Sequence, residues 1–262
     1  MDLTSPEQPQ KRTILLTGGA KRLGKAMSLK LASLGYTLIV HYNHSFQEAA
    51  LLLEEIGTLG GKGFHYQADL SDLAAVEKMI PELVDAHGPL WGMVHNAAHF
   101  EPDRIDTLQQ EELHTHFSVN LYAPLILAQH FSRQFQAHYH AHAALGETGS
   151  IIHMLDYCVH RLPRGFLSYT LSKTALWTAT KQLAVALAPH IRVNAIAPGF
   201  VLSHPRLSDQ KFEMLAESNL FQKRITLAQV ADMVAFLLQA PAITGQLFTL
   251  DNGRHLMPVE YC

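Results

Sequence analysis

Tyr169 and Lys173 are four residues apart in the stretch SYTLSK, and Asp156 lies thirteen residues before the tyrosine. In a helix this spacing places the phenol and the ammonium on one face. Because the positive charge favours the phenolate, we expect Lys173 to lower the pKa of Tyr169 and make its hydroxyl a proton donor near neutral pH. A Tyr-x-x-x-Lys pair alone is weak evidence, since it recurs in ordinary helices. It gains weight from a glycine-bearing turn, TGGAKRLG, near the N-terminus.

Two alternating kinds of segment predict the elements that must position these residues. Short β-branched or apolar runs predict strands at 13–16, 37–41, 63–67, 92–95, 150–154, 192–196 and 246–250. Longer stretches of helical periodicity predict helices at 23–34, 46–59, 73–87, 108–131, 169–188 and 227–238. This alternation implies right-handed crossovers, so we predict a single doubly wound α/β domain whose mainly parallel sheet has helices on both faces.

The glycine-bearing turn directly follows the first predicted strand. Gly18, Gly19 and Gly24 lie where the chain turns from that strand into the first helix. Glycine there lets the backbone approach a pyrophosphate, whose charge is favoured by the helix N-terminus. Tight strand–helix turns also use glycine for steric reasons, so this segment alone leaves a purely structural turn open.

The end of the second predicted strand indicates which dinucleotide binds. A NAD site usually places a carboxylate there, about 20 residues after the first glycine. Here the strand is followed by Asn43, His44 and Ser45, and no acid occurs before Glu48. These three side chains can donate to a 2′-phosphate that an acid would repel, and Arg22 adds positive charge beside the pyrophosphate. The pattern favours NADPH; the alternative is that these residues form a solvated loop.

The composition excludes several other classes of protein. The 262 residues carry a net charge of −3, without the basic excess of a nucleic-acid surface. No apolar run approaches the ~20 residues of a membrane helix, and the polar N-terminus lacks the apolar core of a signal peptide. Two cysteines, Cys158 and Cys262, are too few for a disulfide scaffold. We therefore expect a cytoplasmic protein that binds neither nucleic acid nor membrane, with one domain at 12–262 after a flexible segment at 1–11.

Three histidines lie close together in the sequence around residue 140 and have the side chains of a possible metal site. His138 and His142 are four residues apart and could hold a metal from one helix face, with His140 between them. No acidic residue or further histidine lies at a matching spacing. We expect a solvated helix end there and no metal.

Six motifs occur in the order typical of one enzyme family: TGGAKRLG, ADL at 68–70, HNAA at 95–98, Asn120 in SVNL, Tyr169 with Lys173, and APG at 197–199. In this combination the chain resembles the short-chain dehydrogenases/reductases over about residues 12–253. The resemblance implies a seven-stranded Rossmann-type sheet, a tetrad of Asn, Ser, Tyr and Lys, and a homotetramer. It also implies that Asp69 lies near the adenine and that Asn120 holds a water linking Lys173 to solvent.

The turn, the second strand and the resemblance together predict the residues that contact the cofactor. They are Gly18, Lys21, Arg22, Leu23, Asn43, His44, Ser45, Asp69, Leu70, Asn96, Ala97, Ala98, Tyr169, Lys173, Pro198 and Gly199.

Two departures from the general family pattern narrow the prediction. Arg22 stands where a glycine is usual, and Asp156 stands where the catalytic serine is usual. Together with Phe100 after HNAAH and with the HYNHS strand end, they resemble the pteridine reductases and the dihydromonapterin reductases. In those relatives the arginine faces the pyrophosphate and the pterin, and the aromatic residue sandwiches the pterin against the nicotinamide. The resemblance thus implies a pterin or folate substrate held by Arg22, Phe100, Asp156 and Tyr169.

An aspartate at the position of the serine changes which substrate can react. In a ketone reductase a carboxylate would oppose the developing alkoxide, by about 4 kcal/mol at 4 Å and an effective dielectric near 20. Reduction of a pterin C=N bond avoids that cost, because the ring offers N–H and amino donors that a carboxylate accepts. We expect Asp156, Tyr169, Lys173 and Asn120 to form the catalytic group. Either Tyr169 or a nearby water can deliver the proton to the substrate. The alternative for Asp156 is a surface position in the loop after a strand.

Residues 200–220 are polar and mixed, and the resemblance implies that they form a lid over the substrate. The predicted helices at 108–131 and 169–188 carry apolar residues beyond one stripe, which suggests a subunit interface. The tail after residue 253 is expected near a neighbouring site, with Arg254 as its polar contact.

The sequence therefore leaves three alternative functions. The first is NADPH-dependent reduction of dihydromonapterin, dihydrobiopterin or dihydrofolate to the tetrahydro form. The second is a carbonyl reductase of the same family, such as a 3-oxoacyl-carrier-protein reductase. The third is an inactive dinucleotide-binding sensor, which the presence of Asn120, Tyr169 and Lys173 disfavours.

Overall fold

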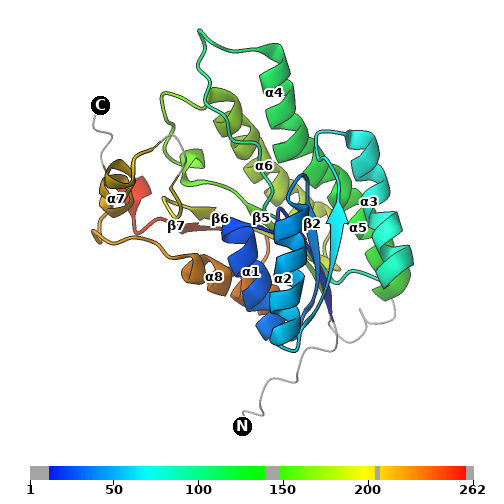
Figure 1. Cartoon of the computed structure of the whole chain (residues 1–262). Coiled ribbons are helices and arrows are strands. Elements are labelled where there is room, and N and C mark those ends of the chain that lie inside the picture. Colours follow the sequence, from blue (N-terminus) through cyan, green and yellow to red (C-terminus); the bar gives the residue numbers. More distant parts are fainter. Residues whose placement is uncertain (1–11, 140–147, 204–206, 258–262) are drawn as a thin grey trace.

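The computed structural model describes residues 12–139, 148–203 and 207–257 and shows one parallel sheet between two layers of helices (Figure 1). The strand order is β3-β2-β1-β4-β5-β6-β7. The strands are β1 (Thr13–Thr17), β2 (Thr37–Tyr42), β3 (Lys62–Gln67), β4 (Gly92–His95), β5 (Gly149–Met154), β6 (Ile191–Pro198) and β7 (Leu247–Leu250). Every pairing is parallel. The predicted doubly wound α/β fold is confirmed. The predicted flexible segment 1–11 lies outside the described residues.

The helices divide between the two faces of this sheet. They are α1 (Arg22–Ser33), α2 (Phe46–Thr58), α3 (Leu73–His87), α4 (Gln110–Phe117), α5 (Ala123–Tyr139), α6 (Leu167–Ala186), α7 (Asp209–Glu217) and α8 (Leu227–Gln239). Helices α1, α2 and α8 cover one face, and α3, α5 and α6 cover the other (Figure 1). None of the helices in the described ranges combines the length and the apolarity that a membrane span requires.

The central strands are buried on both faces. Every residue of β1, β4, β5 and β6 is buried, which is why these strands appear in the sequence as continuous apolar runs rather than as alternating ones. In β1, Leu15 pairs with Ile39 on one side and with Met93 on the other. This close packing fixes the carboxyl ends of the strands, where ligands bind in open α/β sheets.

The structure divides the helix predicted at 108–131. Helix α4 ends at Phe117, a π-helical turn covers Ser118–Tyr122, and α5 begins at Ala123. Single π turns within helices often occur at functional sites. Here the turn contains Asn120, whose side chain is completely buried. The apolar periodicity on either side does not reveal the extra residue in the turn.

Helix α7 lies beside the sheet, near the C-terminal end of the chain, within the predicted lid (Figure 1). The side chain of Ser208 caps it by accepting from the amide of Lys211. Only Phe212 and Ala216 of its nine residues are buried. This short apolar stripe explains why no separate helix was predicted from periodicity.

Candidate active site

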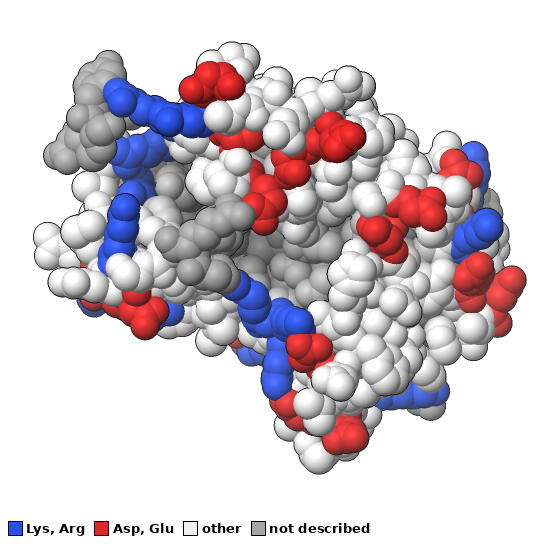
Figure 2. All heavy atoms as spheres, turned by 45° about the horizontal axis from the view of Figure 1, so that its top comes forward, with Lys and Arg blue, Asp and Glu red and all other residues white. Residues whose placement is uncertain are grey.

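A cavity of about 1080 Å³ opens at the carboxyl ends of the strands. Figure 2 shows the hollow on the face that is turned forward, with Lys and Arg side chains along part of its border. Many predicted site residues line it: Gly18, Lys21, Arg22, Leu23, Asn43, Asp69, Leu70, Asn96, Ala97, Ala98, Phe100, Asp156, Tyr169, Pro198 and Gly199. The predicted residues outside its lining are His44, Ser45, Asn120 and Lys173.

The glycine turn forms one wall of this cavity. Gly18 has a positive φ of 61°, and a Cβ there would lie 3.0 Å from Cα of Ala97. A Cβ on Gly24 would lie 2.0 Å from the carbonyl oxygen of Gly18, so only glycine lets helix α1 pack against the turn. Asn96 holds the turn from β4, because its Nδ2 donates to the carbonyls of Thr17 and Gly18 at 3.1 and 2.9 Å. The result is a backbone cradle at a helix N-terminus, which fits a pyrophosphate.

His41 supports the same turn and was not predicted. Its Nδ1 accepts from the amide of Gly18 at 3.1 Å, so its Nε2 carries the proton and donates to the carbonyl of Ala68 at 3.0 Å. Burial lowers the pKa of His41 to about 4, which keeps the imidazole neutral. The residue lies within HYNHS, but a bond that spans 23 positions leaves no local signal.

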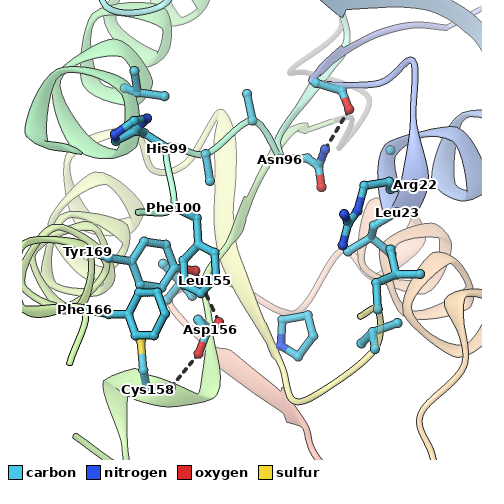
Figure 3. A pocket seen from close by; sticks show the side chains of 18 of the residues that line it. Arg22, Leu23, Asn96, His99, Phe100, Leu155, Asp156, Cys158, Phe166 and Tyr169 are labelled. Carbon is cyan, nitrogen blue, oxygen red and sulfur yellow. Dashed lines mark hydrogen bonds between the residues drawn. The ribbon is translucent and has the colours of Figure 1, made fainter. Parts of the chain in front are cut away.

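Arg22 occupies a backbone conformation that suits glycine. Its φ is 53°, in the left-handed region, although it stands where the family usually has a glycine. The side chain is exposed, points toward the cavity (Figure 3), and donates from Nη2 to the carbonyl of Ser203 at 2.8 Å. Strain of this kind persists at functional sites where the side chain is needed. The guanidinium therefore joins the glycine turn to the start of the predicted lid.

Polar groups cluster where β2 ends. Nζ of Lys21 lies 2.6 Å from Oε1 of Glu48, in the first turn of α2. The hydrogen bonds from Ser71 are the largest cause that lowers the pKa of Asp69, and the neighbouring His44 and Asn43 lower it further. Three predicted cofactor-binding residues thus lie next to acids: Lys21 next to Glu48, and Asn43 and His44 next to Asp69. The sequence did not indicate these pairings.

Asp156 points toward Tyr169 (Figure 3). The Tyr169 hydroxyl donates to Oδ2 of Asp156 at 3.2 Å. Oδ1 accepts from the amide of Cys158 at 2.8 Å, which caps the 3-10 turn Tyr157–Val159 and fixes the carboxylate. Burial raises the pKa of Asp156. The carboxyl group therefore lies beside the phenol, as the resemblance implied for the position of the family's catalytic serine.

The prediction that Lys173 lowers the pKa of Tyr169 is wrong. Burial raises the pKa of Tyr169 well above 10, and the charge of Asp156 raises it further. Lys173 is only 2% exposed and donates from Nζ to the carbonyl of Met154 at 2.8 Å. Burial lowers its own pKa to about 8. The spacing of Tyr169 and Lys173 reflects the charge of the lysine but carries no information on burial or on the carboxylate of Asp156.

Asn120 holds the segment that precedes Phe100. Its Oδ1 accepts from the amide of His99 at 2.9 Å, while Nδ2 donates to the His99 carbonyl and to Oγ of Ser172, both at 3.0 Å. The π-helical turn aims the amide at both partners. The structure thus gives this side chain a positioning role, and its role in holding a water stays a prediction.

Phe100 lies in the cavity against two aromatic rings (Figure 3). Its ring is parallel to that of Phe166, with a centroid distance of 4.5 Å and an interplanar angle of 1°. It meets the Tyr169 ring nearly edge-on at 4.6 Å. These are favoured aromatic geometries. Phe100 thus belongs to an aromatic wall that includes Phe166, which was not predicted.

Three side chains near this wall have the donor set of a metal site. Ligand atoms of His99, Glu112 and His116 lie within 4.8 Å of one another. Both ring nitrogens of His116 already have main-chain partners, since Nδ1 donates to the carbonyl of Glu112 and Nε2 accepts from the amide of Glu101. Because a metal would displace one of these bonds, the arrangement fits a hydrogen-bond network better. His140 and His142 of the other cluster lie outside the described residues.

Arg254 lies beside the predicted lid of its own chain. Its guanidinium donates from Nη1 to the carbonyls of Leu215 and Ser218, at the end of α7. It also lies 4.8 Å from the centroid of the Phe200 ring. These contacts hold the 3-10 turn Arg254–Leu256 next to α7, and the contact of the tail with a neighbouring site stays a prediction.

Comparisons with known proteins agree on one family. The family model described as "Enoyl-(Acyl carrier protein) reductase" matches residues 18–255. A dihydromonapterin reductase from Enterobacter sp. (strain 638) is 29% identical over 246 residues, which cover 94% of this chain and 97% of that protein. The crystal structure of an alternative dihydrofolate reductase 1 (FolM) from Brucella canis, complexed with NADP, is 35% identical. It has a TM-score of 0.87 and covers 97% of this chain and 98% of the other. A short-chain dehydrogenase from Burkholderia cenocepacia J2315 in complex with NADP is 28% identical, with a TM-score of 0.85 over 95% and 99% of the chains.

Proposed function

Because this chain belongs to the short-chain dehydrogenase/reductase family, we propose that it is an NADPH-dependent reductase of pteridines. The products are tetrahydro forms of substrates such as dihydromonapterin, dihydrobiopterin or dihydrofolate. The observation that supports this proposal most directly is the hydrogen bond between Tyr169 and Asp156, on the wall of a cavity that Phe100 also lines. The names of the dihydromonapterin reductase and of the alternative dihydrofolate reductase support the same substrate class.

The residues present fit a dinucleotide. The turn leaves no room for a Cβ at Gly24 and leads directly into the N-terminus of α1, which has no side-chain cap of its own. Arg22 adds a guanidinium, and Asn43, His44 and Ser45 can donate to a 2′-phosphate. When bound there, NADPH supplies the hydride for the reaction.

The substrate chemistry follows from the carboxyl group. In a 7,8-dihydropterin the C6=N5 bond gains a hydride at C6 and a proton at N5. Asp156 accepts hydrogen bonds from ring N–H and amino groups and so orients the heterocycle. Phe100 offers a flat aromatic face to it. A ketone brings no such donors, and Asp156 in its ionised form would repel the developing alkoxide.

Tyr169 and Asp156 together hold the proton near the substrate. Burial keeps the Tyr169 hydroxyl protonated, because the pKa of the phenol is raised. Burial also raises the pKa of Asp156, which makes this carboxyl easier to protonate than an exposed one. We propose that the proton reaches N5 through this pair. Lys173, whose pKa is lowered to about 8, contributes a positive charge that acts on Asp156.

The reduction of a panel of substrates tests this function. Purified protein is mixed with NADPH, and absorbance is followed with dihydromonapterin, dihydrobiopterin, dihydrofolate, biopterin and folate, and with an acetoacetyl thioester as the ketone control. We expect turnover of at least one dihydropterin or of dihydrofolate, with kcat/KM at least ~100-fold above that of the thioester. Turnover of the thioester without any pterin would assign the chain to the carbonyl reductases instead.

We also propose that the chain assembles as a homotetramer. Tyr122 after α4 and Leu171 and Val185 on α6 are 39, 49 and 79% exposed in the single chain. Apolar side chains outside the core are typical of helices that meet a second subunit. Sedimentation velocity would support the proposal with a species of about four times 29.1 kDa, and a monomer at micromolar concentration would contradict it.

A further inference from the structure

Asp103 carries a buried carboxylate for which the proposed reaction has no use. The residue is 4% exposed and lies in the loop between β4 and α4. Its two oxygens accept from the amide of Ser168 at 3.0 and 3.2 Å, and Oδ2 also accepts from the Ser168 hydroxyl. Its main-chain carbonyl accepts from the amide of Leu167 at 3.3 Å. The carboxylate thus satisfies donors at the start of helix α6, 65 positions along the chain.

Helix α6 has no cap of its own. Its N-cap residue is Phe166, which makes no side-chain cap bond. Exposed first-turn amides usually bond to a Ser, Thr, Asp or Asn side chain at this position. The backbone of Phe166 is also left-handed, with φ 61° and ψ 42°. A bulky side chain is strained in that region, so the surroundings must hold it there.

The loop that carries Asp103 touches the catalytic helix at a second point. Phe100 stacks on Phe166 and meets Tyr169 edge-on. The two contacts lie three residues apart on the loop, and Phe166 is one helical turn before Tyr169. Loop and helix are therefore joined by one charged contact and one aromatic contact, and the aromatic contact lines the cavity.

We propose that Asp103 is a positioning residue for substrate binding. It caps α6 from outside the helix and thereby holds Phe166 in its left-handed conformation. Phe166 then supports the ring of Phe100, so that the two form a rigid wall for a flat heterocyclic substrate. The part of this inference that concerns the substrate rests on the proposed pteridine reductase function.

Steady-state kinetics of three variants test the positioning role. Asp103→Ala removes every acceptor of the side chain, Asp103→Asn keeps one carbonyl oxygen for the Ser168 amide, and Ser168→Ala removes only the hydroxyl. We expect KM for the dihydropterin to rise at least ~10-fold in Asp103→Ala and less than ~3-fold in the other two, while the Kd for NADPH changes by less than ~2-fold. A residue that only stabilised the fold would lower the melting temperature and the active fraction but leave KM unchanged, and that result would overturn the proposal.

Phe166→Gly and Phe166→Leu keep the test decisive if Asp103→Ala fails to fold. Glycine suits a φ of 61°, so Phe166→Gly removes the ring without backbone strain. We expect it to raise KM for the dihydropterin as strongly as Phe166→Leu does and to melt at a higher temperature than that variant. An unchanged KM in both variants would contradict the role of the aromatic wall.

Hydrogen exchange separates this inference from the proposed function, because it needs no substrate. We expect the amide of Ser168, which loses its acceptor, to exchange at least ~10-fold faster in Asp103→Ala than in the wild type, with α8 unchanged as the internal control. Equal protection in both proteins would overturn the capping role. If the wild type turned over no pterin, the proposed function would fail, while faster exchange would still support the role of Asp103 at α6.

Discussion

The hydroxyl of Tyr169 donates a hydrogen bond to Oδ2 of Asp156 over 3.2 Å, and burial raises the pKa of both groups. A serine at this position could donate to a developing alkoxide, whereas this carboxyl group accepts from a heterocycle or carries a proton toward it. Under the proposed function, this difference directs the same scaffold away from ketones.

Asn43→Asp should reverse the cofactor preference. We expect the wild type to prefer NADPH over NADH by at least ~10-fold, which corresponds to about 1.4 kcal/mol. The new carboxylate would repel a 2′-phosphate and accept from the ribose hydroxyls. Dissociation constants measured by fluorescence titration should therefore rise for NADPH and fall for NADH. Asn43→Ser is the matched control, since it retains a donor. Equal binding of both cofactors by the wild type would refute the role assigned to Asn43, His44 and Ser45.

Arg22→Gly should raise the stability of the protein and lower its affinity for NADPH. Glycine adopts the φ of 53° without strain, so the free energy of unfolding should rise by about 1 kcal/mol. The guanidinium is lost, and affinity for NADPH should fall about 10-fold. Arg22→Ala should lose the same affinity without the gain in stability, because alanine keeps the strain. Urea denaturation and NADPH titration of both variants measure the two effects. A less stable glycine variant would contradict the account of strain.

Lys173 should make stability depend on pH in the alkaline range. Burial lowers its pKa from the ordinary 10.5 to about 8, so between these values the unfolded chain binds more protons than the folded protein. The free energy of unfolding therefore gains a contribution that is complete above pH 10.5 and is lost as the pH falls through 8. Relative to Lys173→Met, which cannot titrate, the wild type should gain about 2 kcal/mol between pH 7 and pH 9.5. Parallel pH profiles of the urea midpoint would show that burial does not shift this ammonium.

The sequence predicted the sheet closely, because the buried strands stand out as short apolar runs. The predicted strands 92–95 and 150–154 fall on β4 and β5 almost residue for residue. Two helical features were missed. The π-helical turn at Ser118–Tyr122 leaves the apolar pattern unchanged on either side, and α7 has too few buried residues to show a period.

The site was predictable where the family resemblance or a local turn decides it. Asp156 stands at the position of the family's catalytic serine and was therefore expected beside Tyr169, and the glycine turn marked the cofactor wall. Contacts between distant elements left no such pattern: His41 bonds to the glycine turn, and Asp103 caps α6. The predicted direction of the shift in the Tyr169 pKa was wrong, since the spacing of charged residues carries no information on burial.

Asp156→Ser tests the central claim most directly. Kinetics with NADPH give kcat/KM for a dihydropterin and for an acetoacetyl thioester, in the wild type and in the variant. The account predicts that the variant loses at least ~100-fold in dihydropterin reduction, gains in thioester reduction, and binds NADPH with unchanged affinity. A variant that reduced the dihydropterin as well as the wild type, or better, would contradict it.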